Sequence, residues 1–289
     1  MAAGENSYVK WLKSQEIPVF ESHDSCWRRY GRALIPASLA PFFTTLSAGE
    51  ADKLLKKSGA WLLRYSSDAH GRETPWWYIV CDRYDPNALS QNTRSKLRRG
   101  LRRCSVEQVS PVWLGENGYA CYVSAFKRYS NAMPIAQQDF RLQIEKMSTG
   151  PFEFWGVFVG EDLAGYSQCV IERQSAATSV IKLDPSFLRY YTSYALLYRI
   201  VEHYVCQRGF IVSNGNRNVL HDTAFQEFVL KLGFKKWFCR LNVLYRPSLN
   251  IGIRVAFPFR SLLCRLPDHG RLHHVRALMV QEEIRRACQ

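Results

Sequence analysis

The stretch Phe154-Trp-Gly-Val-Phe-Val159, with the turn Gly160-Glu-Asp162 after it, decides the fold of this chain. Two further apolar runs, Ala164–Glu172 and Ala177–Leu183, follow at once. Short apolar runs separated by a few turn residues predict strands that fold back on one another. We therefore expect a three-stranded antiparallel meander over residues 154–183.

The sequence on either side of the meander changes to helical periodicity. Ser193–Arg208 carries apolar residues at helical spacing, with Thr192 or Ser193 placed to cap its start and Gly209 its end. The remaining elements that we predict are strands at Ser105–Val112, Phe210–Ser213 and Lys236–Tyr245, and helices at Glu116–Arg128, Ala136–Met147 and Thr223–Gly233. The order β-α-α-β-β-β-α-β-α-β predicts an α/β (α+β) domain, a mixed sheet flanked by helices.

The N-terminal third has a different pattern. Ala60–Tyr65 and Pro75–Cys81 read as strands joined by a polar loop with Gly71, which predicts an antiparallel hairpin. A basic helix over residues 89–103 follows, with cations at Arg94, Lys96, Arg98, Arg99, Arg102 and Arg103. We divide the chain into an N-terminal extension (1–104), a core domain (105–248) and a basic amphipathic tail (249–289).

Composition narrows the function classes. Apolar residues make up 47% and charged residues 22%, which are globular values and exclude intrinsic disorder. Thirty-nine Lys and Arg against 25 Asp and Glu give a net charge of +14, which predicts an anionic partner. The nine cysteines are irregularly spaced and form no Cys-x-x-Cys pair, so we expect reduced thiols, no disulfide framework and no metal.

The segment Phe228-Val-Leu-Lys-Leu-Gly-Phe234 resembles the helix and Lys-x-Gly-Phe turn of the GCN5-related N-acetyltransferases, the GNAT superfamily. Phe158–Tyr166 is similar to a hairpin of that family, and Leu183–Leu197 stands where its pyrophosphate-binding strand, loop and helix stand. The resemblance covers residues 105–245. It implies a GNAT-like fold and an acyltransferase that moves an acyl group from acyl-CoA to an amine or hydroxyl.

A second resemblance concerns Leu89-Ser-Gln-Asn-Thr-Arg-Ser-Lys-Leu-Arg-Arg-Gly100, which is similar to the basic helix of the FemAB-like branch. It implies an envelope-related acceptor, aminoacyl-tRNA as an alternative donor, and a reduced first GNAT-like half in residues 60–104. Two departures from the family pattern favour a third reading, a non-catalytic scaffold that binds an anionic surface. Thr192 and Tyr194 stand where the family has glycines, and Val229 stands where it has a proton-donating tyrosine.

Candidate site residues follow from these resemblances and from charge. For donor binding we expect Leu183, Arg189, Thr192, Ser193 and Tyr194, because a helix start beside a strand end binds phosphates. The candidate bases are Asp184, Glu172, His221 and Asp222, each of which has a turn, cap or surface role as its alternative. Arg94, Arg98 and Arg99 are the candidates for binding an anionic substrate such as tRNA, with a solvated helix face as the alternative.

The tail combines apolar and basic residues without an acid. Ile251, Ile253, Val255, Phe257 and Phe259 alternate with Arg254 and Arg260. This pattern predicts reversible association with an acidic membrane surface, and packing of the tail on the domain is the alternative. The chain has neither a run of about 20 apolar residues nor an N-terminal secretory pattern, so we expect a cytoplasmic protein that is peripheral to the membrane.

Overall fold

The computed structural model describes residues 6–22, 25–127, 133–220, 224–263, 265 and 271–289. The chain forms two compact units, each assembled from segments that are far apart in the sequence. Unit 1 contains Met1–Trp11, Ile79–Gly215 and Gln226–Lys235. Unit 2 contains Leu12–Tyr78, Asn216–Phe225 and Lys236–Gln289.

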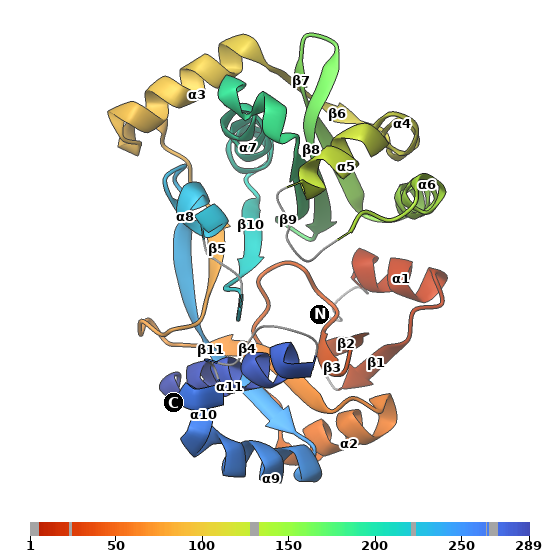
Figure 1. The fold of residues 1–289 in the computed structure, drawn as a ribbon, viewed down its shortest axis with the longest axis vertical. Helices are drawn as coiled ribbons and strands as arrows, with labels where there is room; N and C mark the ends of the chain where they lie inside the picture. The colour runs from red at the N-terminus through yellow and green to blue at the C-terminus, as the bar shows by residue number, and fades with distance from the viewer. Residues whose placement is uncertain (1–5, 23–24, 128–132, 221–223, 264, 266–270) are drawn as a thin grey trace. The chain divides into compact units, whose positions relative to one another are not determined.

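Unit 1 is built on a mixed sheet with the strand order β10-β9-β8-β7-β6 (Figure 1). The strands are β6 (Ser105–Val109), β7 (Phe152–Val159), β8 (Asp162–Glu172), β9 (Ser175–Leu183) and β10 (Ile211–Asn216). From β6 to β9, each strand pairs antiparallel with the next strand in the chain, and β10 runs parallel to β9. The predicted meander is confirmed, because its three runs are adjacent strands of one sheet.

Helices cover both faces of this sheet. Phe154 and Trp155 are neighbours on β7, so their side chains point to opposite faces. Phe154 packs in a cluster with Leu114 and Phe140, whereas the Trp155 indole N–H donates a hydrogen bond to the Tyr204 hydroxyl. The helices are α1 (Ser7–Ser14), α3 (Gln91–Arg103), α4 (Pro111–Asn117), α5 (Tyr119–Phe126), α6 (Gln137–Lys146), α7 (Thr192–Val201) and α8 (Ala224–Leu230), with 3₁₀ turns at Pro86–Ala88, Met147–Thr149 and Pro185–Tyr190. The predicted fold class, a mixed sheet flanked by helices, is confirmed.

The long helix predicted over 193–208 is an α-helix for little more than half of that length. The α-helix ends at Val201, and Glu202–Gln207 continue it as a π-helical turn. Tyr204 in this turn is completely buried, and its hydroxyl also donates a hydrogen bond to the Glu153 carboxylate at 2.6 Å. The chain leaves the turn through Gly209, whose φ of +66° is left-handed.

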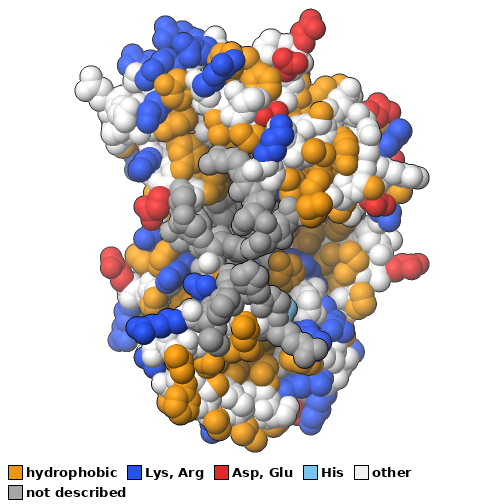
Figure 2. Space-filling model, in the orientation of Figure 1, with side chains coloured by type: hydrophobic (Ala, Val, Ile, Leu, Met, Phe, Trp, Pro, Cys, Tyr) orange, Lys and Arg blue, Asp and Glu red, His pale blue; other side chains and the backbone are white. Residues whose placement is uncertain are grey.

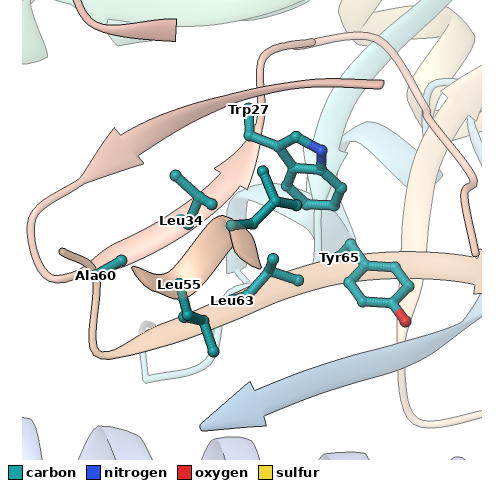
Figure 3. Close-up of a cluster of buried hydrophobic side chains, with 7 residues drawn as sticks. Trp27, Leu34, Leu55, Ala60, Leu63 and Tyr65 are labelled. Carbon is teal, nitrogen blue, oxygen red and sulfur yellow. The ribbon is translucent and has the colours of Figure 1, made fainter. Parts of the chain in front are cut away.

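The sheet strands of unit 2 follow the order β1-β2-β3-β4-β11. Its strands are β1 (Val19–Ser22), β2 (Ser25–Tyr30), β3 (Ala33–Pro36), β4 (Leu62–Asp68) and β11 (Lys235–Tyr245), and helix α2 (Ala48–Ser58) packs beside them. Trp27, Leu34, Leu55 and Leu63 meet in the buried cluster of this unit (Figure 3). A capping box between Ser47 and Glu50 fixes the start of α2.

The predicted hairpin between Ala60–Tyr65 and Pro75–Cys81 is wrong. Both runs form strands, β4 and β5 (Trp77–Cys81), but β4 pairs antiparallel with β11 from Leu62↔Tyr245 to Asp68↔Cys239. The Thr74 hydroxyl and the Trp76 carbonyl bond to the backbone of Cys239 on β11. Strand β11, about 170 residues later in the chain, thus pairs with β4 in the position where we had predicted β5.

The C-terminal segment folds into helices α9 (Pro247–Ala256), α10 (Arg260–Leu263) and α11 (Arg271–Ala287), with a 3₁₀ turn at Phe257–Phe259. Ile253 and Phe257 are buried in a cluster with Met279 of α11. These two residues were predicted to enter a membrane, and that part of the prediction is wrong because the fold already covers them. Within the described ranges, no helix is long and apolar enough to cross a membrane.

Candidate functional site

Strands β9 and β10 of unit 1 pair only at their start. The parallel register joins Ser175–Ala177 to Ile211–Ser213, although β9 continues to Leu183. Thr178 lies at the point of separation: its hydroxyl donates to the Ser213 carbonyl (3.1 Å) and accepts from the Asn214 amide (2.9 Å). Beyond Thr178, the strand register that the described residues show gives this edge of β9 no further pairing with β10.

A β-bulge marks the same point of β9. Cys169 pairs with Thr178 and Gln168 with Val180, so Ser179 is the extra residue. The side chains of Gln168 and Ser179 bond to each other at 3.0 Å, which holds the bulge in place. The bulge re-aims Val180–Leu183, the part of the strand that leads to the predicted donor loop.

The loop after β9 turns sharply into α7. Asp184 caps the 3₁₀ turn, and Tyr191, which precedes α7, takes the left-handed conformation with φ +63°. Tyr191 is the N-cap residue, and no side chain caps the helix. The predicted capping by Thr192 or Ser193 is therefore wrong, because both residues already belong to the first turn. Helix N-terminal N–H groups without a cap attract anions.

Thr192 adds a second feature to this helix start. Its side chain is completely buried, and its hydroxyl has no hydrogen-bond partner among the described residues. A buried hydroxyl without a partner costs about 1–3 kcal/mol, so an orphan of this kind is informative. Of the other predicted donor residues, Leu183, Ser193 and Tyr194 are half-buried and Arg189 is exposed. Tyr194 packs edge-on against Phe228 at 4.9 Å, and Leu183 lies over Gly165.

The basic helix α3 packs directly against this loop. Gly100 makes the approach possible, since a Cβ at that position would lie 2.8 Å from the Tyr191 carbonyl oxygen. The Arg99 guanidinium lies over the Tyr191 ring, 4.8 Å from its centroid. The predicted basic helix and the predicted donor loop thus form one corner of unit 1, which we call the α3–α7 corner.

Positive charge accumulates at this corner. Arg98, Arg99 and Arg102, with Ser95 and Leu101, line a shallow hollow of about 530 Å³ on α3. Figure 2 shows Lys and Arg side chains gathered over α3. In the part of the chain that the structure describes, no basic residue of α3 forms an ion pair with a carboxylate. Two predicted residues are tied locally, since Arg94 donates to the Asn87 carbonyl and Arg189 to the Tyr190 hydroxyl.

The predicted bases are placed far apart. Asp184 follows the end of β9, whereas Glu172 is paired with Ser175 at its start, roughly 25–30 Å away at the strand rise per residue. Glu172 is buried and accepts a hydrogen bond from Asn6. His221 and Asp222 lie outside the described residues. Among the described residues no group of three or more His, Cys, Asp and Glu is placed to bind a metal ion.

Asp184 is held in a capping role. Its carboxylate accepts hydrogen bonds from the backbone N–H (2.9 Å) and the hydroxyl (2.7 Å) of Ser186. Partial burial acts to raise the pKa of Asp184, but these bonds and one from Ser124 outweigh it and hold the pKa below its usual value. A carboxylate stabilised in its charged form is a weaker proton acceptor.

Lys182 is a candidate that the sequence reasoning missed. It lies at the end of β9, with its ammonium 4.3 Å from the centroid of the Phe126 ring on α5. Burial lowers the pKa of Lys182. The sequence signal was a lysine inside the apolar run Val180–Leu183, which we had read as a strand only.

Comparisons with known proteins found similarity among solved structures. No family model matches the sequence, and no curated protein matches it. Among solved structures, the C-terminal domain of a protein assigned as a lysylphosphatidylglycerol synthetase from Agrobacterium fabrum is similar, with a TM-score of 0.54 and 10% identity over 87% of this chain and 91% of that one.

FemX is similar with a TM-score of 0.55 and 8% identity, covering 86% of this chain and 92% of that one. A GCN5-related N-acetyltransferase-like protein from Streptococcus suis has a TM-score of 0.43 at 10% identity over 83% and 92% of the two chains. Identities this low establish the shared architecture alone. The first two structures therefore show that this chain shares their mixed α/β fold.

Proposed function

We propose that this chain is a transferase that moves an acyl group from a phosphate-bearing donor to an amine or hydroxyl. The observation that carries the proposal is the uncapped start of α7, with the orphan Thr192 hydroxyl at its base and the arginines of α3 beside it. Buried hydroxyls and helix N–H groups left without partners match the needs of a bound phosphate. The fold of FemX and of the lysylphosphatidylglycerol synthetase domain supports the same reaction class.

The chemistry needs positioning more than covalent help. The acceptor nitrogen or oxygen attacks the acyl carbon, the bond from that carbon to the donor sulfur or oxygen breaks, and the acceptor proton passes to a base or to water. The unpaired edge of β9 beyond Thr178 would align the acyl arm and offer N–H groups to the developing oxyanion. Lys182, at the end of that strand, is the candidate for accepting the proton.

Acyl-CoA is the first candidate donor. The separation of β9 and β10 beside an uncapped helix start offers an extended backbone edge and an anion site in sequence, as a pantetheine arm with a pyrophosphate requires. The left-handed Tyr191 turns the loop into α7, so this turn does not depend on glycine at Thr192 or Tyr194.

Aminoacyl-tRNA is the second candidate donor, and the charge on α3 favours it. Six cations lie between Arg94 and Arg103 of α3, a distance of about 14 Å along the helix at 1.5 Å per residue. A pyrophosphate engages only a small part of such a length, whereas a nucleic-acid backbone follows all of it. The name of the lysylphosphatidylglycerol synthetase describes an aminoacyl group carried on a lipid, which fits this donor and an envelope-related acceptor.

Calorimetric titration of the full chain with acetyl-CoA, longer acyl-CoAs and a tRNA tests the proposal. Thr192→Val keeps the volume and removes the orphan hydroxyl, so it should stabilise the free protein by about 1 kcal/mol yet weaken donor binding about tenfold. Thr178→Val is the matched control, because its hydroxyl is bonded and its loss should destabilise the protein. A Thr192→Val variant that binds the donor as the wild type does would contradict the proposal.

Charge reversal separates the two donors. Arg98→Glu with Arg99→Glu should abolish tRNA binding and reduce its salt dependence, and should weaken acyl-CoA binding less. Arg29→Glu with Arg72→Glu makes the same charge change at exposed positions of unit 2 and should leave binding unchanged. If neither donor binds, the scaffold interpretation replaces the enzyme.

A further inference from the structure

Four large apolar side chains are exposed in a row on unit 2. Ile251, Val255, Phe259 and Leu262 keep 65%, 67%, 61% and 63% of their surface accessible. Their spacing of four, four and three residues places them on one side of the segment that runs through α9 and α10. We call these four residues the α9–α10 stripe, and Figure 2 shows hydrophobic side chains over these helices.

The opposite side of the same segment is anchored in the fold. Ile253 and Phe257 are buried at 3% and 9% in the cluster with Met279. The guanidinium of Arg286 lies over the Phe257 ring, 3.8 Å from its centroid. Because the buried side is fixed by these contacts, the α9–α10 stripe is held pointing outward and cannot turn inward without unpacking α11.

The charge around the stripe identifies its partner. Residues 246–265 contain four arginines and no Asp or Glu. Arg254 and Arg265 are exposed, and Arg260 is placed 3.5 Å from Glu283 of α11. A second copy of a chain with a net charge of +14 would bring like charges together around the stripe. Nucleic acid would leave the four apolar side chains in water.

We propose that the α9–α10 stripe docks on an anionic lipid membrane, with its apolar side chains at the level of the headgroups and Arg254 and Arg265 on the lipid phosphates. This surface lies in unit 2 and does not rest on the proposed transferase activity. It keeps Ile251, Val255 and Phe259 from the sequence-based prediction, leaves out the buried Ile253 and Phe257, and adds Leu262.

Co-sedimentation of the full chain with vesicles tests this proposal. Vesicles of phosphatidylcholine with a third of phosphatidylglycerol should bind the protein at least about tenfold more tightly than phosphatidylcholine alone. Val255→Ser with Leu262→Ser should weaken that binding by about tenfold or more. Arg254→Gln with Arg265→Gln should weaken it and make it less sensitive to salt.

The chain provides a matched control. Val112 and Leu142 in unit 1 are exposed at 50% and 47%, so Val112→Ser with Leu142→Ser makes the same two substitutions on another surface. That variant should bind as the wild type does. Circular dichroism should show that all variants are folded, since every substituted side chain is exposed.

Three results would overturn the proposal. The first is wild-type protein that ignores anionic vesicles at low salt. The second is equal loss of binding in the stripe variant and in the matched control. The third is a dimer, seen by light scattering and abolished by Val255→Ser with Leu262→Ser, which would make the stripe a contact between copies of the chain.

Discussion

Substitution of Gly100 by Ala should separate the two parts of the α3–α7 corner. The added Cβ would lie 2.8 Å from the Tyr191 carbonyl oxygen, 3.3 Å from the Tyr191 Cβ and 3.5 Å from the Ala195 Cβ. The first contact involves backbone, so it is relieved only if α3 moves away from the start of α7. Overpacking of this kind costs about 1–3 kcal/mol, and the better helix propensity of Ala returns about 0.5–1 kcal/mol. We expect a net loss of about 1–2 kcal/mol in the free energy of unfolding, together with weaker donor binding.

Gly252→Ala is the internal standard for that measurement. Gly252 lies in the middle of α9, and a Cβ there would meet no atom within 4 Å. Its substitution should stabilise the protein by about 0.5–1 kcal/mol through helix propensity alone. Urea unfolding of the two variants should therefore give shifts of opposite sign in the midpoint. A Gly100→Ala variant as stable as Gly252→Ala would refute the close packing of α3 on α7.

Two further predictions concern titrating groups. Hydrogen bonds hold the pKa of Asp184 below its ordinary value of 3.8, so its carboxylate stabilises the fold above about pH 4 and loses this contribution as pH falls through the lower folded-state pKa. The Asp184→Asn variant should therefore be less stable than the wild type at pH 7. Urea midpoints of the two proteins that differ equally at pH 7 and pH 3 would contradict this. Among the eight described cysteines, Cys206 is exposed, whereas burial raises the pKa of Cys81, Cys121, Cys169 and Cys239 to about 12. Peptide mapping after brief alkylation at pH 8 should therefore find Cys206 modified and these four intact.

The sequence alone was enough to predict the elements whose contacts are local in the chain. The meander of β7, β8 and β9 followed from runs of apolar residues separated by short turns, and α3 was predicted as the basic helix over residues 89–103. Each of these elements depends on neighbours within about 20 residues. Hydrophobic periodicity and turn residues are therefore enough to predict such elements.

Long-range pairing was not readable in the same way. The sequence contains nothing that tells β4 to pair with β11 rather than with β5, because all three runs contain apolar, strand-forming residues. The start of α7 shows a subtler limit. Thr192 and Ser193 are good capping residues, and only the left-handed turn at Tyr191 moves them inside the helix and leaves the Thr192 hydroxyl without a partner.

The candidate site was predicted as two unconnected features, an anion-binding loop at Leu183–Leu197 and a basic helix. The glycine that lets them meet, Gly100, has an ordinary helical position in the sequence, so its role appears only when the distance to Tyr191 is known. The tail shows the same limit, since a list of apolar residues does not say which side packs. Ile253 and Phe257 turned out to be core, and Ile251 and Val255 surface.

Hydrogen–deuterium exchange in the presence of a saturating donor tests the central claim most directly, namely that donor phosphates bind at the start of α7 under α3. With acyl-CoA or aminoacyl-tRNA bound, the backbone amides of Thr192 and Ser193 should exchange more slowly, because N–H groups that no side chain caps become bonded to phosphate. Peptides from α3 should be protected along with them, and over the greater length if the donor is tRNA. Protection confined to other segments, with peptides 91–103 and 183–197 unchanged while the donor is bound, would contradict the account.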